Sequence, residues 1–237
     1  KPLILYLFVL SRPVASPLLR PGGVKSRVAV AISFLALALG VWLAPSSVEA
    51  AAPGTIQPSA DDSWLGGGTG PGVMDTNYNS WTTLRVTNKA PVNRTVVRFD
   101  LPTDWAIKTA TLSLFIVTPP DQTRTYATHR ITAPWVEDQV TWNSRATGTP
   151  WATPGGDGDV TAGATATATV TTAGGWVNWN ILQADVQAWT GTNNYGFRIR
   201  DGSEGGSGGH QTDFASNSNG TVANRPKLTV TYLGKVT

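Results

Sequence analysis

Short segments in which apolar and polar residues alternate recur along most of this chain and constrain its fold more than any other feature. Residues 94–101 (RTVVRFDL) place Val97 and Phe99 on one side of an extended chain and Arg94 and Arg98 on the other. The same alternation marks residues 82–87, 110–117, 139–143, 176–181, 194–201 and 227–233. A period of two predicts β-strands with one buried face.

The connections between these segments are rich in Gly, Pro, Asn and Asp, which favour turns. Residues 181–189 (ILQADVQAW) alone indicate a short helix. Residues 153–175 begin as a Gly-rich loop, and their ATATATVTT portion is either an edge strand or a disordered linker. Many short strands with one helix predict an all-β fold, namely a jelly-roll-like β-sandwich of two antiparallel sheets with one short helix.

The N-terminal region has the pattern of a secretory signal peptide. Lys25 and Arg27 precede an apolar run at 28–44, and Ala50 offers a small residue for cleavage. Retention of the run as a membrane anchor is the alternative. We expect a secreted, extracellular or cell-surface protein with no membrane span after signal cleavage. The predicted organisation is an upstream or non-native segment at 1–23, a signal peptide at 24–50, a short linker at 51–59 and one β-sandwich module at 60–234.

Composition narrows the classes of chemistry that the chain can support. It has no cysteine, which excludes disulfides and thiolate sites. The net charge of +3 arises mostly in the first 50 residues, because the chain from position 51 onward carries 13 basic and 14 acidic residues. A nucleic-acid-binding domain is typically basic. Nucleic acid is therefore not an expected partner.

Several strings of the chain resemble one known family when they are taken together. They are DTNYNSWTTLRV (75–86), RTVVRFDL (94–101), ITAPWVEDQVTWN (131–143) and ANRPKLTVTY (223–232). In this order they are similar to the DNRLRE-type domain, also described as the disaggregatase-related carbohydrate-binding module family, over residues 60–233. The resemblance implies a jelly-roll β-sandwich in a secreted or cell-surface protein. It also implies a polysaccharide partner, which for some members is acidic.

Arginine supplies the clearest candidate ligand contacts. Two expected strands, at 94–101 and 194–201, each carry a pair of arginines on the face opposite to that of their buried Phe. If those strands are neighbours, four guanidinium groups form one outer patch that suits the carboxylates of a uronate polymer. The alternative is that nearby acidic residues neutralise them in surface ion pairs. The candidate residues are Arg85, Arg94, Arg98, Arg198 and Arg200.

Tryptophan is the second candidate contact, because nine tryptophans follow position 50. Trp142 and Trp179 fall on inward-facing positions of expected strands and are assigned to the core. Trp81, Trp151 and Trp176 are candidates to stack on sugar rings. The alternative is that they cap the ends of the sandwich.

No catalytic constellation is evident, and we expect the protein not to be an enzyme. His129 and His210 are the only histidines, and Glu137 is expected to tie a loop rather than to transfer a proton. The chain has no HExxH or phosphate-binding GxxxxGK[ST] motif.

Calcium is the one cofactor that the sequence suggests, as a structural ion. Carboxylates in loops offer the oxygen ligands that calcium prefers, although their spacing matches no EF-hand. The candidate ligands are Asp61, Asp62, Asp157 and Asp159.

Together these features favour a secreted, non-catalytic module that binds a polysaccharide, with an acidic uronate polymer as the favoured ligand. A structural or adhesive sandwich without a ligand is the alternative, and it predicts that the outer arginines are all paired and that no groove exists. A polysaccharide lyase is a third hypothesis, and it requires a His or Tyr beside an arginine in a cleft.

Overall fold

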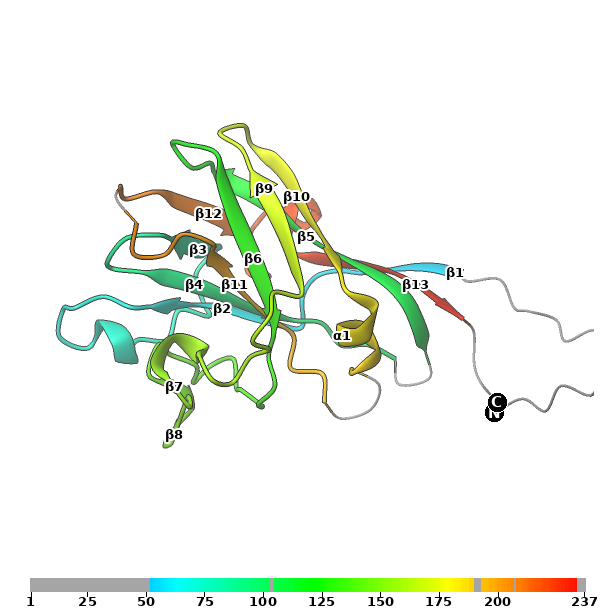
Figure 1. The fold of residues 1–237 in the computed structure, drawn as a ribbon, viewed down its shortest axis with the longest axis horizontal. Coiled ribbons are helices and arrows are strands. Elements are labelled where there is room, and N and C mark those ends of the chain that lie inside the picture. The colour runs from blue at the N-terminus through cyan, green and yellow to red at the C-terminus, as the bar shows by residue number, and fades with distance from the viewer. Residues whose placement is uncertain (1–51, 103–104, 190–192, 207, 234–237) are drawn as a thin grey trace, which may run out of the picture. The chain divides into compact units, whose positions relative to one another are not determined.

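The computed structural model describes residues 52–102, 105–189, 193–206 and 208–233 (Figure 1). Within these ranges the chain forms one short α-helix, α1 (Gln183–Gln187), and three 3-10 turns, η1 (Val73–Asp75), η2 (Pro154–Gly156) and η3 (Val222–Asn224). The remaining elements are the strands β1 (Ala52–Ile56), β2 (Asp61–Gly66), β3 (Thr83–Thr87), β4 (Asn93–Arg98), β5 (Ala106–Thr118), β6 (Arg124–Arg130), β7 (Ser144–Ala146), β8 (Thr149–Pro150), β9 (Ala166–Val170), β10 (Gly175–Ile181), β11 (Phe197–Asp201), β12 (Gln211–Ala215) and β13 (Lys227–Leu233).

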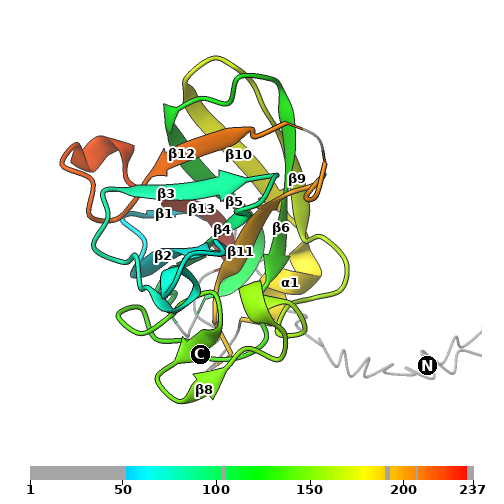
Figure 2. The ribbon, with the colours of Figure 1, turned by 90° about the vertical axis from the view of Figure 1, so that its left-hand side faces the viewer.

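One curled antiparallel sheet contains eleven of these strands. Its neighbours follow the order β1-β13-β5-β12-β3-β4-β11-β6-β9, while β10 also pairs with β5 and β2 with β4. The first part of β5 pairs with β13 and its last residues pair with β12, so this long strand belongs to both layers. Figures 1 and 2 show how the sheet folds over on itself. The predicted all-β sandwich is confirmed, with hydrogen bonds that join its layers through β5.

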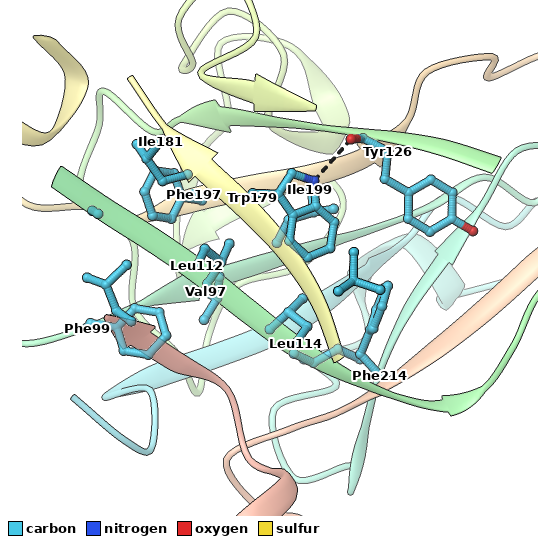
Figure 3. Close-up of a cluster of buried hydrophobic side chains, with 14 of the residues drawn as sticks. Val97, Phe99, Leu112, Leu114, Tyr126, Trp179, Ile181, Phe197, Ile199 and Phe214 are labelled. Atoms are coloured by element: carbon cyan, nitrogen blue, oxygen red, sulfur yellow. Dashed lines mark hydrogen bonds between the residues drawn. The ribbon is translucent and has the colours of Figure 1, made fainter. Parts of the chain in front are cut away.

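The main core lies between the two layers of this sheet (Figure 3). It contains Val97 and Phe99 from β4, Leu112 and Leu114 from β5, and Trp179 from β10, all fully or almost fully buried. The indole Nε1 of Trp179 donates a hydrogen bond to the carbonyl of Tyr126 at 3.0 Å, which ties β10 to β6. The predicted inward faces of these strands are therefore confirmed.

A second, smaller core lies on the opposite face of β4. Val96 packs there with Ile131, Trp135 and Val140, because the segment that follows β6 (131–160, the covering segment) folds back over the sheet. β4 is consequently buried on both faces, with Val97 in the main core and Val96 in the second one. This covering segment forms one wall of the site described below.

The prediction of a strand at 139–143 is wrong. The amide of Val140 donates to the carbonyl of Val136 at 2.8 Å, and Thr141 is bonded to Ser144, so this stretch is a series of turns. Its alternating residues pack against β4 instead of continuing a ladder. Sequence patterning also overlooked β2 and β12, whose buried polar residues obscure a clean alternation.

Two further predictions have clear outcomes. The short helix is confirmed as α1, and the ATATATVTT stretch contains β9, which pairs with β6 at the end of the strand order. The predicted upstream segment and signal peptide at 1–50 lie outside the described residues. Among the residues that are described, no helix has the length and apolar character needed to span a bilayer.

Candidate functional site

Two paired strands place three arginine side chains on one side of the sheet. In the ladder between β4 and β11, Arg198 lies opposite Val96. Because side chains alternate along a strand, Arg94, Arg198 and Arg200 all project away from the main core. The two strands are therefore neighbours, as the predicted arginine patch requires.

Arg94 is buried, and its guanidinium group is extensively paired. Its Nε and Nη2 atoms donate to the two carboxylate oxygens of Glu204 at 2.8 and 2.7 Å. Its Nη1 atom donates to the Gly155 carbonyl at 2.8 Å and to Asp157 at 2.9 Å, and its guanidinium carbon lies 5.0 Å from the centre of the Trp142 ring. Burial alone lowers the pKa of Arg94, but the bonds and charges of Glu204 and Asp157 outweigh it and raise that pKa above its ordinary value.

Arg198 is buried as deeply but is less completely neutralised. Only 2% of its side chain is exposed, and its Nη1 contacts the Asp157 carboxylate. Its Nε has no hydrogen-bond partner in the described part of the chain. Burial, and then the charge of Arg94, lower the pKa of Arg198. Burial raises the pKa of Asp157, but Arg198 and Arg94 outweigh it and lower that pKa, so Asp157 is ionised at neutral pH.

The tight turn η2 brings Gly155 and Asp157 over these arginines. Gly155 has a φ of 81°, in the left-handed region that favours glycine. A Cβ atom at this position would lie 2.7 Å from the Trp142 ring and 2.8 Å from Nη1 of Arg94. Glycine is therefore required both by the backbone conformation and by the close approach of the two side chains.

A cavity of about 380 Å³ opens beside the arginines, lined by Arg198, Arg200, His129 and Asp157 together with residues that follow Asp157. The Nδ1 atom of His129 lies 3.0 Å from the Thr161 carbonyl, so we assign the ring proton to Nδ1. Burial lowers the pKa of His129, the bond to Thr161 opposes this shift, and the charges of Arg198 and Arg200 add to it. His129 is therefore neutral at physiological pH, with its Nε2 atom available as an acceptor.

Arg200 gives the cavity its most exposed cation. Its side chain is 34% exposed, and its nearest carboxylate is that of Glu204, which lies 3.5 Å away and already binds Arg94 at two oxygens. Its Nε, like that of Arg198, has no partner among the described residues. Three guanidinium groups thus share two carboxylates, which leaves one positive charge in excess. Such a site suits an anionic ligand with a planar carboxylate or a sulfate.

Comparison with known protein families places this site within one of them. The sequence profile of carbohydrate-binding module family 96 matches residues 55–232, which include the whole cavity and both cores. The chain belongs to carbohydrate-binding module family 96. A search of curated proteins found no significant match. The predicted carbohydrate-binding module is confirmed at the level of the family, and the narrower DNRLRE-type resemblance stays a prediction.

The family 96 module divides the predicted patch of four arginines. Arg98 pairs with Asp61 of β2 and does not share the carboxylates of the other three. Arg85, on β3, binds Asp213 of β12 through its Nε at 2.8 Å. The structure therefore brings together Arg94, Arg198 and Arg200, and it buries the first two although the alternation had indicated an outer face.

The three candidate tryptophans have different surroundings in the family 96 module. Trp151, a candidate to stack on a sugar ring, is instead 3% exposed in the second core, and its Nε1 donates to the Thr141 carbonyl at 3.0 Å. The cause is the covering segment, which folds back over β4. Trp176 faces outward as predicted, with Nζ of Lys227 lying 3.8 Å from its ring centre. Trp81 is 46% exposed.

The four predicted calcium ligands of the module have other partners. Asp61 and Asp157 pair with arginines, and Asp159 accepts a hydrogen bond from the Ala152 amide at 2.7 Å. Asp62 is completely buried. Within the described ranges, no group of three or more His, Asp or Glu side chains could hold a metal ion. Calcium binding stays a prediction.

Sequence reasoning overlooked Glu204 and the position of His129 as parts of the site. Glu204 lies in the Gly-rich loop after β11, where no periodicity marks it, although an acid four residues after Arg200 is a weak signal of an ion pair. Register places His129 directly opposite Arg198, but this pairing emerges only in the folded sheet. Glu137 ties loops as expected, because its carboxylate accepts from the Asp62 amide and from Asn217, both at 2.9 Å.

Proposed function

We propose that the chain is a secreted, non-catalytic module that binds an acidic, uronate-containing polysaccharide outside the cell. Membership in a carbohydrate-binding module family supports a glycan partner. The observation that carries the acidic ligand is the cavity lined by Arg198 and Arg200, beside which three guanidinium groups share two carboxylates and leave one positive charge in excess. Secretion is supported by the signal-like pattern at 24–50, outside the described residues.

The residues around the cavity have distinct roles in this proposal. Arg200 is the exposed cation that a sugar carboxylate meets first, and Arg198 provides a fixed positive charge behind it. His129 accepts a hydrogen bond from a sugar hydroxyl through its unprotonated Nε2. Because Asp157 and Glu204 hold these arginines before a ligand arrives, little side-chain entropy is lost on binding.

Affinity electrophoresis of the purified protein in gels that contain alginate, pectate or a neutral polymer tests the proposal. We expect retention by the two uronate polymers, and we expect added salt to weaken it because ionic contacts are screened. Arg200→Gln removes the exposed cation and should weaken retention at least about tenfold, the cost of one charge-assisted contact. Lys108→Ala is the matched control, because it removes an exposed charge from β5 and Lys108 does not line the cavity.

Two results would contradict this function. If Arg200→Gln is retained as strongly as the wild-type protein, the cavity is not the binding site. Absence of retention on every polymer would favour the alternative of a structural or adhesive sandwich. Each candidate arginine has a carboxylate partner, as that alternative expects. The cavity weighs against it, because a structural sandwich without a ligand predicts no groove.

A lyase is a second candidate function, and one observation favours it, since His129 lines the cavity beside Arg198 and Arg200. Uronate elimination needs a base for the sugar proton and an acid for the leaving oxygen. His129 could be the base, but the other titratable groups lining the cavity are an ionised Asp157 and two arginines. Incubation with a uronate polymer should therefore release no unsaturated product, which ultraviolet absorbance would detect.

A further inference from the structure

A second cavity lies over β3 and β12. Its volume is about 200 Å³, and its polar lining is formed by Arg85, Thr87, Lys89, Asn93 and Gln211. It shares no lining residue with the first cavity. Its lining includes two cationic side chains and no acidic one.

Three aromatic rings form a cluster that contacts Arg85, a residue that lines this cavity, and we call it the Trp81 platform (Trp64, Tyr78 and Trp81). The rings of Trp64 and Tyr78 stack with centroids 3.6 Å apart, and Trp81 meets both almost at right angles with centroids 5.5 and 5.7 Å away. The carbonyl of Trp81 accepts a hydrogen bond from the Ser216 hydroxyl at 2.6 Å. The ring contacts orient the indole and the bond to Ser216 fixes its backbone, while Trp81 is the one aromatic residue among the large exposed apolar side chains of the described residues.

Arg85 links the platform to the cavity. Its guanidinium carbon lies 5.3 Å from the centre of the Trp64 ring and 6.0 Å from that of Trp81. Its Nε and Nη2 atoms donate to Asp213 at 2.8 and 3.4 Å, while Nη1 makes no hydrogen bond within the described residues. With 26% of its side chain exposed, Arg85 presents a fixed, partly free cation to the cavity.

We propose that the Trp81 platform and this cavity form a second glycan subsite, which binds an acidic sugar by stacking on Trp81 and by ion pairing with Arg85 and Lys89. The apolar face of a pyranose ring packs on the indole, and its carboxylate meets Nη1 of Arg85 and the Lys89 ammonium. The inference rests on the proposed function, because it takes the same acidic polysaccharide as the ligand. A polymer that reaches both subsites gains avidity that a short fragment lacks.

The test compares variants of the whole protein on a uronate polymer and on a short oligouronate from that polymer. Trp81→Ala should weaken retention of the polymer about tenfold, whereas Trp81→Phe keeps a ring and should restore most of it. Lys89→Ala should weaken retention about threefold at low salt. Since Lys89 is exposed, this variant tests the subsite without risk to folding, and Lys108→Ala again serves as the charge control.

The outcomes separate the two proposals. If Trp81→Ala and Lys89→Ala bind like the wild type while Arg200→Gln loses retention, the second subsite is overturned and the proposed function stands. If Arg200→Gln binds like the wild type while both of the other variants lose retention, the first cavity is not the site and the Trp81 subsite is supported. Failure of the wild-type protein to bind any uronate polymer overturns both.

Discussion

For individual residues of this module, the pairing of buried charges determines the direction in which each pKa shifts. Arg94 and Arg198 are both buried on the same face, yet their pKa values shift in opposite directions. Arg94 has the Glu204 carboxylate at two oxygens and part of Asp157, whereas Arg198 has only its share of Asp157. The difference in compensation, rather than in burial, gives the two pKa values their opposite directions and leaves Arg198 less neutralised than Arg94.

Asp62 is the residue from which we predict a pH-dependent stability. Burial raises its pKa from 3.8 to about 7, with Ser59 and Asn217 donating to one carboxylate oxygen at 2.6 and 2.7 Å. Between these values the folded protein holds a proton that the unfolded chain releases. The free energy of unfolding should therefore fall as pH rises from about 4 to about 7, by up to about 4 kcal/mol.

Urea unfolding at about pH 5 and about pH 8 measures this change. Asp62→Asn cannot ionise, so the part of the pH dependence that Asp62 causes should disappear in this variant. Asp138→Asn is the matched control, since the Asp138 side chain is exposed. An Asp62→Asn protein with an unaltered pH profile would show that burial of this carboxylate is not the cause.

At the scale of elements, the site depends on a turn that closes over two strands. η2 places the Gly155 carbonyl and the Asp157 carboxylate within reach of Arg94 on β4 and Arg198 on β11. The strands supply the cations and the turn supplies their partners. Any change that displaces η2 therefore exposes buried guanidinium groups and deforms the first cavity.

We predict that Gly155→Ala lowers the free energy of unfolding by about 3 kcal/mol, from backbone strain and from the clash with Trp142 and Arg94. Gly148 has a similar φ of 71° but no atom near a Cβ position. Gly148→Ala should consequently cost only about 1 kcal/mol. Chemical denaturation of the two variants measures the difference, and equal losses would mean that the close packing over Gly155 contributes nothing.

At the scale of the whole molecule, two cores on opposite faces of β4 hold the site against the sandwich. The main core unites the layers, and the second core attaches the covering segment that carries η2 and the cavity wall. The site therefore lies between a rigid sheet and a segment fixed by aromatic packing. We therefore expect few of its polar groups to reorganise on binding.

We predict that Trp179→Ala lowers the free energy of unfolding by about 3–5 kcal/mol, because it opens a large hole between the layers and removes the bond to the Tyr126 carbonyl. Trp81→Ala should cost far less, since nearly half of that residue is already exposed. Thermal or urea unfolding of both variants provides the comparison. A small loss for Trp179→Ala would contradict its assignment to the joint between β10 and β6.

Local properties of this protein follow from its amino-acid sequence alone. Alternation identified β4, β10 and β11 and the face on which each of their side chains lies, because the two-residue period of a strand depends only on neighbouring residues. It thereby placed Phe99 and Phe197 inward and Arg94, Arg198 and Arg200 on the opposite face. The Gly-rich and Pro-rich intervals likewise indicated where the chain turns.

What covers those faces, and which residues contact one another, depends on the tertiary structure. The segment after β6 packs on β4 from 35 or more positions away in the chain, which turns Trp151 and Arg198 from expected surface residues into buried ones. The pairing of Glu204 with Arg94 and the position of His129 opposite Arg198 have the same origin. Burial and ion pairing depend on contacts between distant segments, and local periodicity carries no information about those contacts.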